Sequence, residues 1–206
     1  LTEYQGIVIS GGPQSVTSAD APAFDPNLFN IQCPILGICY GMQLLNHVHG
    51  GTVTTHATRE DGVFLVNILN TSPVFATLGE TTEVLLTHGD AVKDVAPGFN
   101  VIATSPEGIV AAIEDPERRQ YGVQFHPEVD LTKEGKQMLH NFLFRVAKCE
   151  PTFTIPSRLE TAVVEIQEQV GDKSVLVLVS GGVDSSVCVA LVRKALPADK
   201  IFAVHV

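Results

Sequence analysis

Residues 34–51, PILGICYGMQLLNHVHGG, form the stretch that decides the fold. An apolar run ends just before Cys39, which stands between Gly37 and Gly41 at the start of a segment with helical periodicity. Small glycines on both sides of a turn allow a strand and the following helix to pack closely. The stretch therefore predicts a buried strand, a sharp turn with Cys39 at its apex and a helix, a unit of a parallel α/β fold.

Strands and helices alternate along much of the chain. Short runs rich in Val and Ile predict buried strands, and segments with apolar residues at helical spacing separate them. The expected strands are 6–10, 34–38, 121–125, 174–179 and 201–206, and the expected helices are 41–49, 134–148, 157–170 and 185–196. Residues 52–114 instead alternate short strands with turn residues such as EDG and SPEG, which predicts an antiparallel insertion and hence a mixed sheet.

The segment CEPTFTIPS, residues 149–157, predicts a linker between two domains. Two prolines in it follow an amphipathic helix and precede a new set of strands and helices, as at many domain boundaries. We therefore expect domains over 1–148 and 158–206. Because Leu1 is not Met and Val206 ends an apolar run without a turn signal, we also expect the chain to be cut at both ends.

Composition limits the class of protein. Of the 206 residues, 45% are hydrophobic and 17% are charged, which indicates a globular chain. The net charge of −10 argues against a surface for DNA or RNA, so any nucleotide is expected to be a small substrate. No run approaches the roughly 20 apolar residues of a membrane span, and no signal pattern is present, which favours a soluble cytosolic protein. Four cysteines without CxxC spacing predict reduced thiols rather than a zinc site or disulfides.

Cys39 has the surroundings of a nucleophile. At the apex of a strand-to-helix turn, a thiol is presented at the carboxyl edge of the sheet, where the positive end of the helix dipole favours the thiolate. A lone cysteine is more often a buried structural residue, and Cys33 and Cys188 are interpreted in that way. For Cys39 the flanking glycines and the preceding strand reverse this preference.

The tripeptide His126-Pro127-Glu128 follows the expected strand 121–125. Alternate residues of an extended segment project to the same side, and Pro127 stiffens the backbone between the imidazole and the carboxylate. Alone, such a tripeptide is more often a solvated turn. Together with Cys39, it predicts a thiol, an imidazole that carries the proton and a carboxylate that orients the imidazole.

The segment Ser10-Gly11-Gly12-Pro13 follows the first expected strand. Paired glycines at that place can direct backbone N–H groups at a developing oxyanion. The N–H of Gly12 and that of Tyr40, the residue after Cys39, are the candidate oxyanion hole. A plain tight turn is the alternative interpretation of Gly-Gly-Pro.

Polar groups for a substrate are expected from two further places. Thr87-His88-Gly89-Asp90 is a polar segment in an apolar neighbourhood, and the carboxylate of Asp90 suits an α-ammonium group. Gln43 lies one helical turn after Cys39. Helical spacing alone allows it to face either the same pocket or solvent.

The motifs SGGP, GICYGMQ, THGD and FHPE occur in the order and approximate spacing of the class I glutamine amidotransferases, which residues 6–148 resemble. The resemblance implies a flavodoxin-like α/β domain that hydrolyses L-glutamine through a γ-glutamyl thioester. The implied roles are nucleophile for Cys39, base and then acid for His126, orienting group for Glu128, and glutamine binding for Gln43, His88 and Asp90. The family's first strand and helix are expected upstream of Leu1.

Residues 180–186, SGGVDSS, follow the expected strand 174–179 and lead into the expected helix 185–196. A Gly-rich turn at a helix N-terminus directs backbone N–H groups at an anion, and serine hydroxyls add donors, so the loop predicts phosphate binding. It lacks the GK[ST] ending of a Walker loop, and a generic turn is the alternative. The expected phosphate-binding residues are Ser180, Gly181, Gly182, Val183, Asp184, Ser185 and Ser186.

The loop resembles the pyrophosphate loop of the ATP pyrophosphatase superfamily, which implies the start of an adenine nucleotide alpha hydrolase-like parallel α/β domain. It also implies binding of ATP, with Mg²⁺ near Asp184 and no prosthetic group. An amidotransferase domain followed by this loop resembles the GMP synthase family of glutamine-dependent carbon–nitrogen ligases. That resemblance implies adenylation of XMP, amination by glutamine-derived ammonia, and a homodimer for the longer protein.

Only the beginning of a synthetase domain lies within 158–206, so this chain is expected to perform at most the glutaminase half-reaction. Two alternatives stay open. One is a glutaminase that serves another synthetase, such as carbamoyl phosphate or anthranilate synthesis, which the SGGVDSS loop disfavours. The other is an inactive binding or regulatory fragment.

Overall fold

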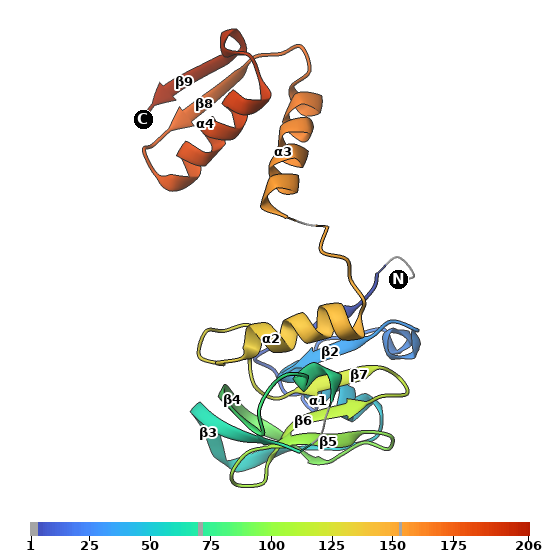
Figure 1. Cartoon of the computed structure of the whole chain (residues 1–206). Helices are drawn as coiled ribbons and strands as arrows, with labels where there is room; N and C mark the ends of the chain where they lie inside the picture. Colours follow the sequence, from blue (N-terminus) through green and yellow to red (C-terminus); the bar gives the residue numbers. More distant parts are fainter. Residues whose placement is uncertain (1–3, 70–71, 153) are drawn as a thin grey trace. The chain divides into compact units, whose positions relative to one another are not determined.

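The computed structural model describes residues 4–69, 72–152 and 154–206, with the backbone alone of 56–59. Over this part of the chain the protein divides into two compact units, Leu1–Cys149 and Glu150–Val206 (Figure 1). Every helix that the structure describes is too short or too polar to cross a membrane.

A mixed sheet organises the first unit. Its described residues form seven strands in the order β1-β2-β7-β6-β5-β3-β4. The pairs β1–β2 and β2–β7 are parallel, and the other neighbours are antiparallel. The bounds are Ile7–Ile9 for β1, Ile35–Ile38 for β2, Thr52–Ile68 for β3, Thr81–Asp94 for β4, Asn100–Thr104 for β5, Val110–Asp115 for β6 and Gln120–Val123 for β7.

This arrangement confirms the mixed α/β fold, including antiparallel strands within 52–114. The expectation that these strands are short is confirmed for β5, with 5 residues, and β6, with 6, but was wrong for β3, with 17, and β4, with 14. The EDG sequence lies inside β3, where Asp61 pairs with Thr87 and Gly62 with Leu86. Pairing with β4 therefore overrides the local preference of these residues for a turn.

Helices cover both faces of the sheet. Ile35 belongs to one hydrophobic cluster and Leu36 to another, so neighbouring residues of β2 face opposite sides. On one side α1, Tyr40–Val48, contributes Met42. On the other side α2, Gly135–His140, continues into the π-helix η3, Asn141–Val146, which contributes Phe142 (Figure 1). Two short 3₁₀ helices, η1 at Pro26–Asn30 and η2 at Pro73–Phe75, lie in the connections.

The second unit is a smaller layer of helices on a parallel pair of strands. Its elements are α3 at Ile155–Val170, β8 at Val175–Val179, α4 at Val183–Ala195, η4 at Ala198–Lys200 and β9 at Ile201–His205. A capping box begins α3, because the side chains of Thr154 and Ser157 each accept a hydrogen bond from the other's backbone N–H.

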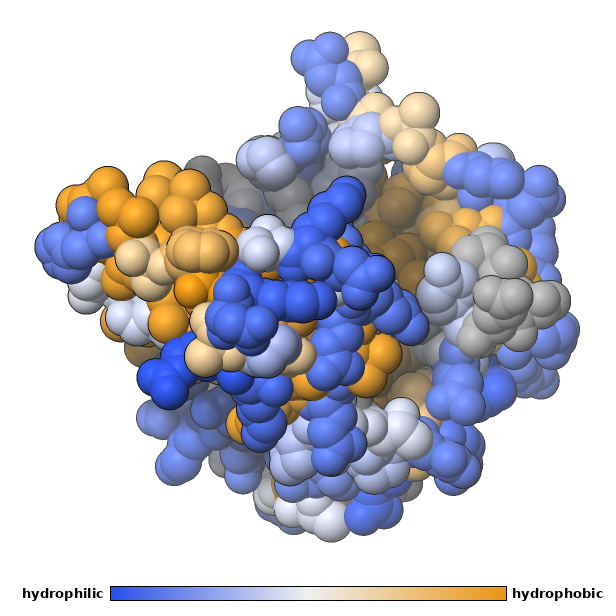
Figure 2. Space-filling view, turned by 90° about the horizontal axis from the view of Figure 1, so that it is seen from above, coloured by the Kyte–Doolittle hydropathy of each residue, from blue (hydrophilic) through white to orange (hydrophobic). Residues whose placement is uncertain are grey.

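One face of the β8–β9 pair is apolar and exposed. Leu176 pairs with Phe202 and Leu178 with Val204, and all four side chains are about half exposed or more. Figure 2 shows hydrophobic side chains gathered over these strands, at the left of that view. Parallel sheets are normally covered on both faces, so this face lacks the cover that β2 and β7 have in the first unit.

Candidate active site

Cys39 lies in a sharp turn between β2 and α1, with φ 51° and ψ −103°. Such a backbone is unfavourable for a residue other than glycine, so the surroundings must impose it. A Cβ on Gly37 would lie 2.4 Å from the carbonyl oxygen of Gly41, and one on Gly41 would lie 2.2 Å from that of Ile9. The backbones of β1, β2 and α1 thus meet at contact distance around the thiol.

His126 lies beyond the end of β7 and beside Cys39. The hydrogen bond to Cys39 raises the pKa of His126 to about 9; burial lowers it, and a hydrogen bond to Glu128 raises it. The Nδ1 atom of His126 lies 2.7 Å from Oε1 of Glu128, which leaves Nε2 for the thiol. At neutral pH the ring is therefore an imidazolium and carries a proton beside the sulfur.

The segment that carries His126 is fixed by Thr132, which the sequence did not point to. The Thr132 hydroxyl donates to the carbonyl of His126 at 2.6 Å and accepts from the N–H of Leu85 at 3.1 Å. Gly135 is also required, because a Cβ there would lie 2.1 Å from the carbonyl oxygen of Pro127. Both residues tie the histidine segment to its neighbours, β4 and α2.

The loop after β1 passes over the thiol. A Cβ on Gly11 would lie 3.0 Å from Cε1 of His126 and 3.6 Å from Cβ of Cys39. Gly12 lies beside Tyr40, since its Cβ would be 3.7 Å from Cγ of that ring. Gly12 and Tyr40 are thus neighbours, and Gly11, to which the sequence gave no role, lies over the Cys39 and His126 side chains.

A pocket of about 420 Å³ opens beside Cys39. It is lined by residues 12–15, by Cys39, Tyr40 and Gln43, and by residues 87–90. The SGGP loop, the start of α1 and the THGD segment of β4 therefore meet at one pocket.

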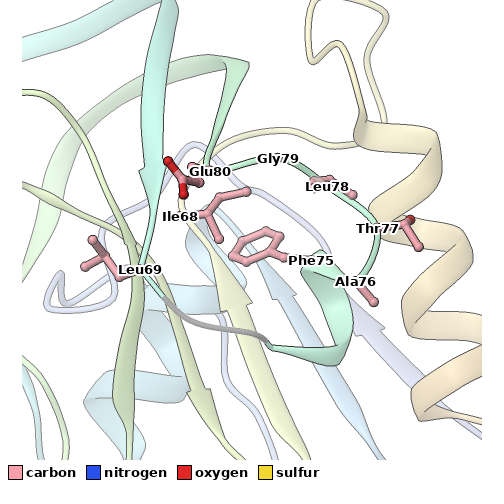
Figure 3. Close-up of a pocket in the computed structure, with 8 residues that line it drawn as sticks. All are labelled: Ile68, Leu69, Phe75, Ala76, Thr77, Leu78, Gly79 and Glu80. Carbon is pink, nitrogen blue, oxygen red and sulfur yellow. The ribbon is translucent and has the colours of Figure 1, made fainter.

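A larger cavity, of about 620 Å³, lies elsewhere in the first unit. Figure 3 shows the side chains that line it, which come from Ile68, Leu69 and residues 75–80. It contains none of the predicted site residues. Chemistry rather than size therefore identifies the smaller pocket as the candidate active site.

Gln43 faces the protein interior and is 4% exposed, so the solvent-facing alternative is wrong. Its Nε2 donates to the carbonyl of Asp90 at 2.8 Å and to Oε1 of Gln124 at 3.1 Å. Both amide hydrogens are thereby used, and only Oε1 of Gln43 is left to meet a ligand in the pocket.

His88 and Asp90 have different surroundings. Nδ1 of His88 lies 2.9 Å from the carbonyl oxygen of Asp90, and Nε2 lies 2.9 Å from a carboxylate oxygen of buried Glu60, without the alignment of a hydrogen bond. The carboxylate of Asp90 accepts from the hydroxyl of Thr55 at 2.7 Å, and Asp90 is among the residues that line the pocket. The ring nitrogens of His88 thus face protein groups, whereas the carboxylate of Asp90 is held by Thr55.

The SGGVDSS loop joins β8 to α4 in the second unit. Gly181 has φ 80°, and Gly182 is the N-cap of α4, where no side chain of the described residues caps the helix. The hydroxyls of Ser185 and Ser186 donate to the carbonyl of Gly182 at 3.0 and 2.8 Å. Asp184 lies in the first turn of α4. The described residues contain no group of three or more His, Cys, Asp or Glu placed to hold a metal ion, so Mg²⁺ near Asp184 stays a prediction.

Known proteins resemble this chain along nearly all of its length. A GMP synthase [glutamine-hydrolyzing] of Dictyostelium discoideum is 49% identical, and the match covers 98% of this chain and 29% of that protein. A probable GMP synthase [glutamine-hydrolyzing] of Caenorhabditis elegans is 51% identical, and the match covers 100% of this chain and 28% of that protein. Both matches include the second unit, and the chain spans less than a third of these relatives.

A solved glutamine amidotransferase of Thermotoga maritima shares the fold, with a TM-score of 0.57 at 21% identity, over 95% of this chain and 79% of that one. The sequence model of the class-I glutamine amidotransferases matches residues 1–146, which hold the whole candidate site around Cys39. The chain therefore belongs to the class-I glutamine amidotransferase family, and it is similar to the amidotransferase part of GMP synthases.

Proposed function

We propose that the first unit hydrolyses L-glutamine to glutamate and ammonia, with Cys39 as the nucleophile. The arrangement of Cys39, His126 and Glu128 carries this proposal. The hydrogen bond to Cys39 raises the pKa of His126 to about 9, so the imidazolium is already present beside the sulfur. Glu128, 2.7 Å from Nδ1, orients the ring and stabilises its charge.

In the first half of the reaction, the Cys39 thiolate attacks the γ-carboxamide carbon of glutamine. The negative charge that develops on the amide oxygen receives hydrogen bonds from the N–H groups of Gly12 and Tyr40. His126 then gives its proton to the amide nitrogen, the carbon–nitrogen bond breaks and ammonia leaves. The glutamyl group is left on the sulfur as a thioester.

In the second half, water attacks the thioester. His126, now neutral, takes a proton from this water, and the carbon–sulfur bond breaks. Glutamate leaves, and the Cys39 thiolate and His126 imidazolium are restored. One water is consumed for each glutamine, with no other reactant.

The substrate is held at its α-carbon end by Asp90 and Gln43. Asp90 lines the pocket and its carboxylate suits the α-ammonium group, and Oε1 of Gln43 is the acceptor left to that side chain. His88 supports this end of the site by facing the Asp90 carbonyl at 2.9 Å, so we assign it an indirect part in binding.

We further propose that the ammonia serves a GMP synthase reaction in a longer protein. Identity of 49% and 51% to GMP synthases over nearly the whole chain supports this proposal. The SGGVDSS loop would hold the pyrophosphate of ATP through backbone N–H groups and hydroxyls, with Mg²⁺ near Asp184. ATP would adenylate XMP, and ammonia would displace AMP to give GMP.

The glutaminase proposal is tested with Cys39→Ala and a matched control, Cys33→Ala. Both cysteines are 7% exposed, but Cys33 donates to the carbonyl of Tyr4 at 3.3 Å, and burial raises the pKa of its thiol. Glutamate release should fall at least about a thousandfold in Cys39→Ala and stay close to the unmutated rate in Cys33→Ala. Hydrolysis that survives in Cys39→Ala would refute the assignment.

The synthetase proposal is tested in the longer protein with ATP labelled at the α or γ phosphate. In the presence of XMP and ammonia, the expected products are AMP and pyrophosphate, because the loop lacks the Walker lysine that accompanies γ-phosphoryl transfer. Cys39→Ala should leave this ammonia-dependent reaction intact. Release of ADP and orthophosphate would contradict the pyrophosphatase interpretation.

A further inference from the structure

Gln124 lies just beyond β7, two residues before His126, and is completely buried. We infer that Gln124 is a further catalytic residue, whose side-chain amide donates a hydrogen bond to the Cys39 sulfur and holds the thiolate in position. The inference rests on the proposed role of Cys39 as nucleophile.

The contact itself is direct. Nε2 of Gln124 lies 3.5 Å from Sγ of Cys39, within the longer range of hydrogen bonds to sulfur. Gln124 does not line the pocket of residues 12–15 and 87–90, so it reaches the sulfur from within the protein. It therefore touches the reacting atom without occupying the substrate's place.

The direction of this hydrogen bond is fixed by a chain of neighbours. The carbonyl oxygen of Asp90 can only accept, so Gln43 must turn its Nε2 toward it, at 2.8 Å. The second hydrogen of that nitrogen meets Oε1 of Gln124, at 3.1 Å. Gln124 then has only its own Nε2 to present to Cys39, which settles the orientation of an amide that could otherwise be flipped.

This arrangement gives the sulfur two donors, His126 and Gln124, which lie two residues apart on the segment after β7. A thiolate accepts hydrogen bonds better than a thiol does, so a fixed donor favours the reactive form. Because Gln124 is fully buried, water cannot readily replace its amide. An apolar side chain at this position should therefore leave the sulfur with His126 alone.

The chain offers a matched control in Gln120. This residue is also a buried glutamine, 1% exposed, but it lies at the opposite end of β7 from Cys39. Its Nε2 donates to the carbonyl of Phe29 at 2.8 Å. Replacing either glutamine by leucine removes one buried amide from the same strand region, and only one of the two changes alters the sulfur.

The test compares Gln124→Leu with Gln120→Leu in the intact chain. The rate of alkylation of Cys39 by iodoacetamide is measured without glutamine at one fixed pH near neutrality, by mass spectrometry of the peptide that contains Cys39. Gln124→Leu should slow alkylation on the order of tenfold, because a hydrogen bond to a charged group contributes a free energy that corresponds to about that factor. Gln120→Leu should change the rate less than about twofold. An unchanged rate in Gln124→Leu would overturn the inference.

Two further measurements separate this role from a structural one. In Gln124→Leu, kcat for glutamine hydrolysis should fall with the alkylation rate, and any change in KM should be smaller, because the carbonyl of Asp90 still holds the Gln43 amide. If Gln124→Leu does not fold, Gln124→Met replaces it, with the same expected loss. A rise in KM alone, with an unchanged kcat and a normal alkylation rate, would contradict a contact to the sulfur.

Failure of this inference can be told apart from failure of the proposed function. If Cys39→Ala still hydrolyses glutamine, Cys39 is not the nucleophile and both ideas fall. If Cys39→Ala is inactive while Gln124→Leu alkylates and turns over normally, only the role of Gln124 is wrong.

Discussion

The two units build the same local element, a strand followed by a glycine-containing turn and a helix, under different constraints. In the first unit a Cβ on Gly41 would lie 2.2 Å from a carbonyl oxygen, whereas in the second the nearest atom to a Cβ on Gly182 is Oγ of Ser180, at 3.6 Å. Packing requires glycine in the first turn. In the second turn the space over the glycines is open, as a site for an approaching phosphate would need.

The same contrast extends to the cores. The Cys39 turn lies between hydrophobic clusters on the two faces of the sheet. Among the described residues of the second unit, only Ala195 and Leu196 are buried, and α3 buries none of its side chains. A strained backbone can persist at Cys39 because its surroundings are rigid, and the second loop has no comparable support within its own unit.

The largest expected effect concerns the site itself. His126→Ala should lower glutamine hydrolysis on the order of a thousandfold, because the proton carrier is lost. Glu128→Gln should lower it only about tenfold, since the Glu128 side chain is 42% exposed and water can partly replace it. Steady-state glutamate release measures both, and Asp184→Ala in the second unit is the control that should leave it unchanged. Equal losses in His126→Ala and Glu128→Gln would show that Glu128 does more than orient the imidazole.

A smaller effect tests whether glycine is required for different reasons in the two turns. Alanine normally stabilises a helix relative to glycine, but Gly41→Ala should destabilise the first unit by about 3 kcal/mol because the new methyl meets backbone. Gly182→Ala should change stability by less than about 0.5 kcal/mol. Hydrogen exchange followed on peptides of each unit gives both values. A stable Gly41→Ala protein would remove the contrast between the turns.

The smallest effect is a dependence of stability on pH. The hydrogen bond to Cys39 raises the pKa of His126 from 6.5 to about 9. Protonation of His126 therefore stabilises the folded state, fully below about pH 6.5, and this contribution is lost as pH rises through about 9. We expect a loss of about 1 to 2 kcal/mol in the first unit, because solvent screens the partly exposed Glu128. Denaturant unfolding across this range measures it, and His126→Gln should flatten the curve. A slope that persists in His126→Gln would have another origin.

Local sequence was enough to predict the parts of the site that depend on neighbouring residues. Gly37 and Gly41 flank Cys39 within five positions, and His126 and Glu128 are two positions apart, so turn chemistry and strand periodicity could find them. The mixed sheet also follows from the alternation of apolar runs.

What the sequence did not predict depends on distant partners. Gln124 meets Cys39 across 85 positions, and Thr132 meets Leu85 across 47. Nothing in the local pattern of QFHPE distinguishes a buried amide that faces sulfur from one that fills a core. Asp61 and Gly62 suggested a turn, and only their partners on β4 place them inside a long strand.

At Cys39 the residue that the proposed reaction needs is also one that destabilises the fold. A φ of 51° costs a cysteine of order 1 to 3 kcal/mol, while glycine adopts it freely at a smaller entropic cost. Replacing Cys39 by glycine should therefore give a protein with a higher free energy of unfolding and no nucleophilic sulfur. Directed evolution of this protein for heat resistance alone would tend to discard the nucleophile early, so any such selection must be coupled to a demand for ammonia.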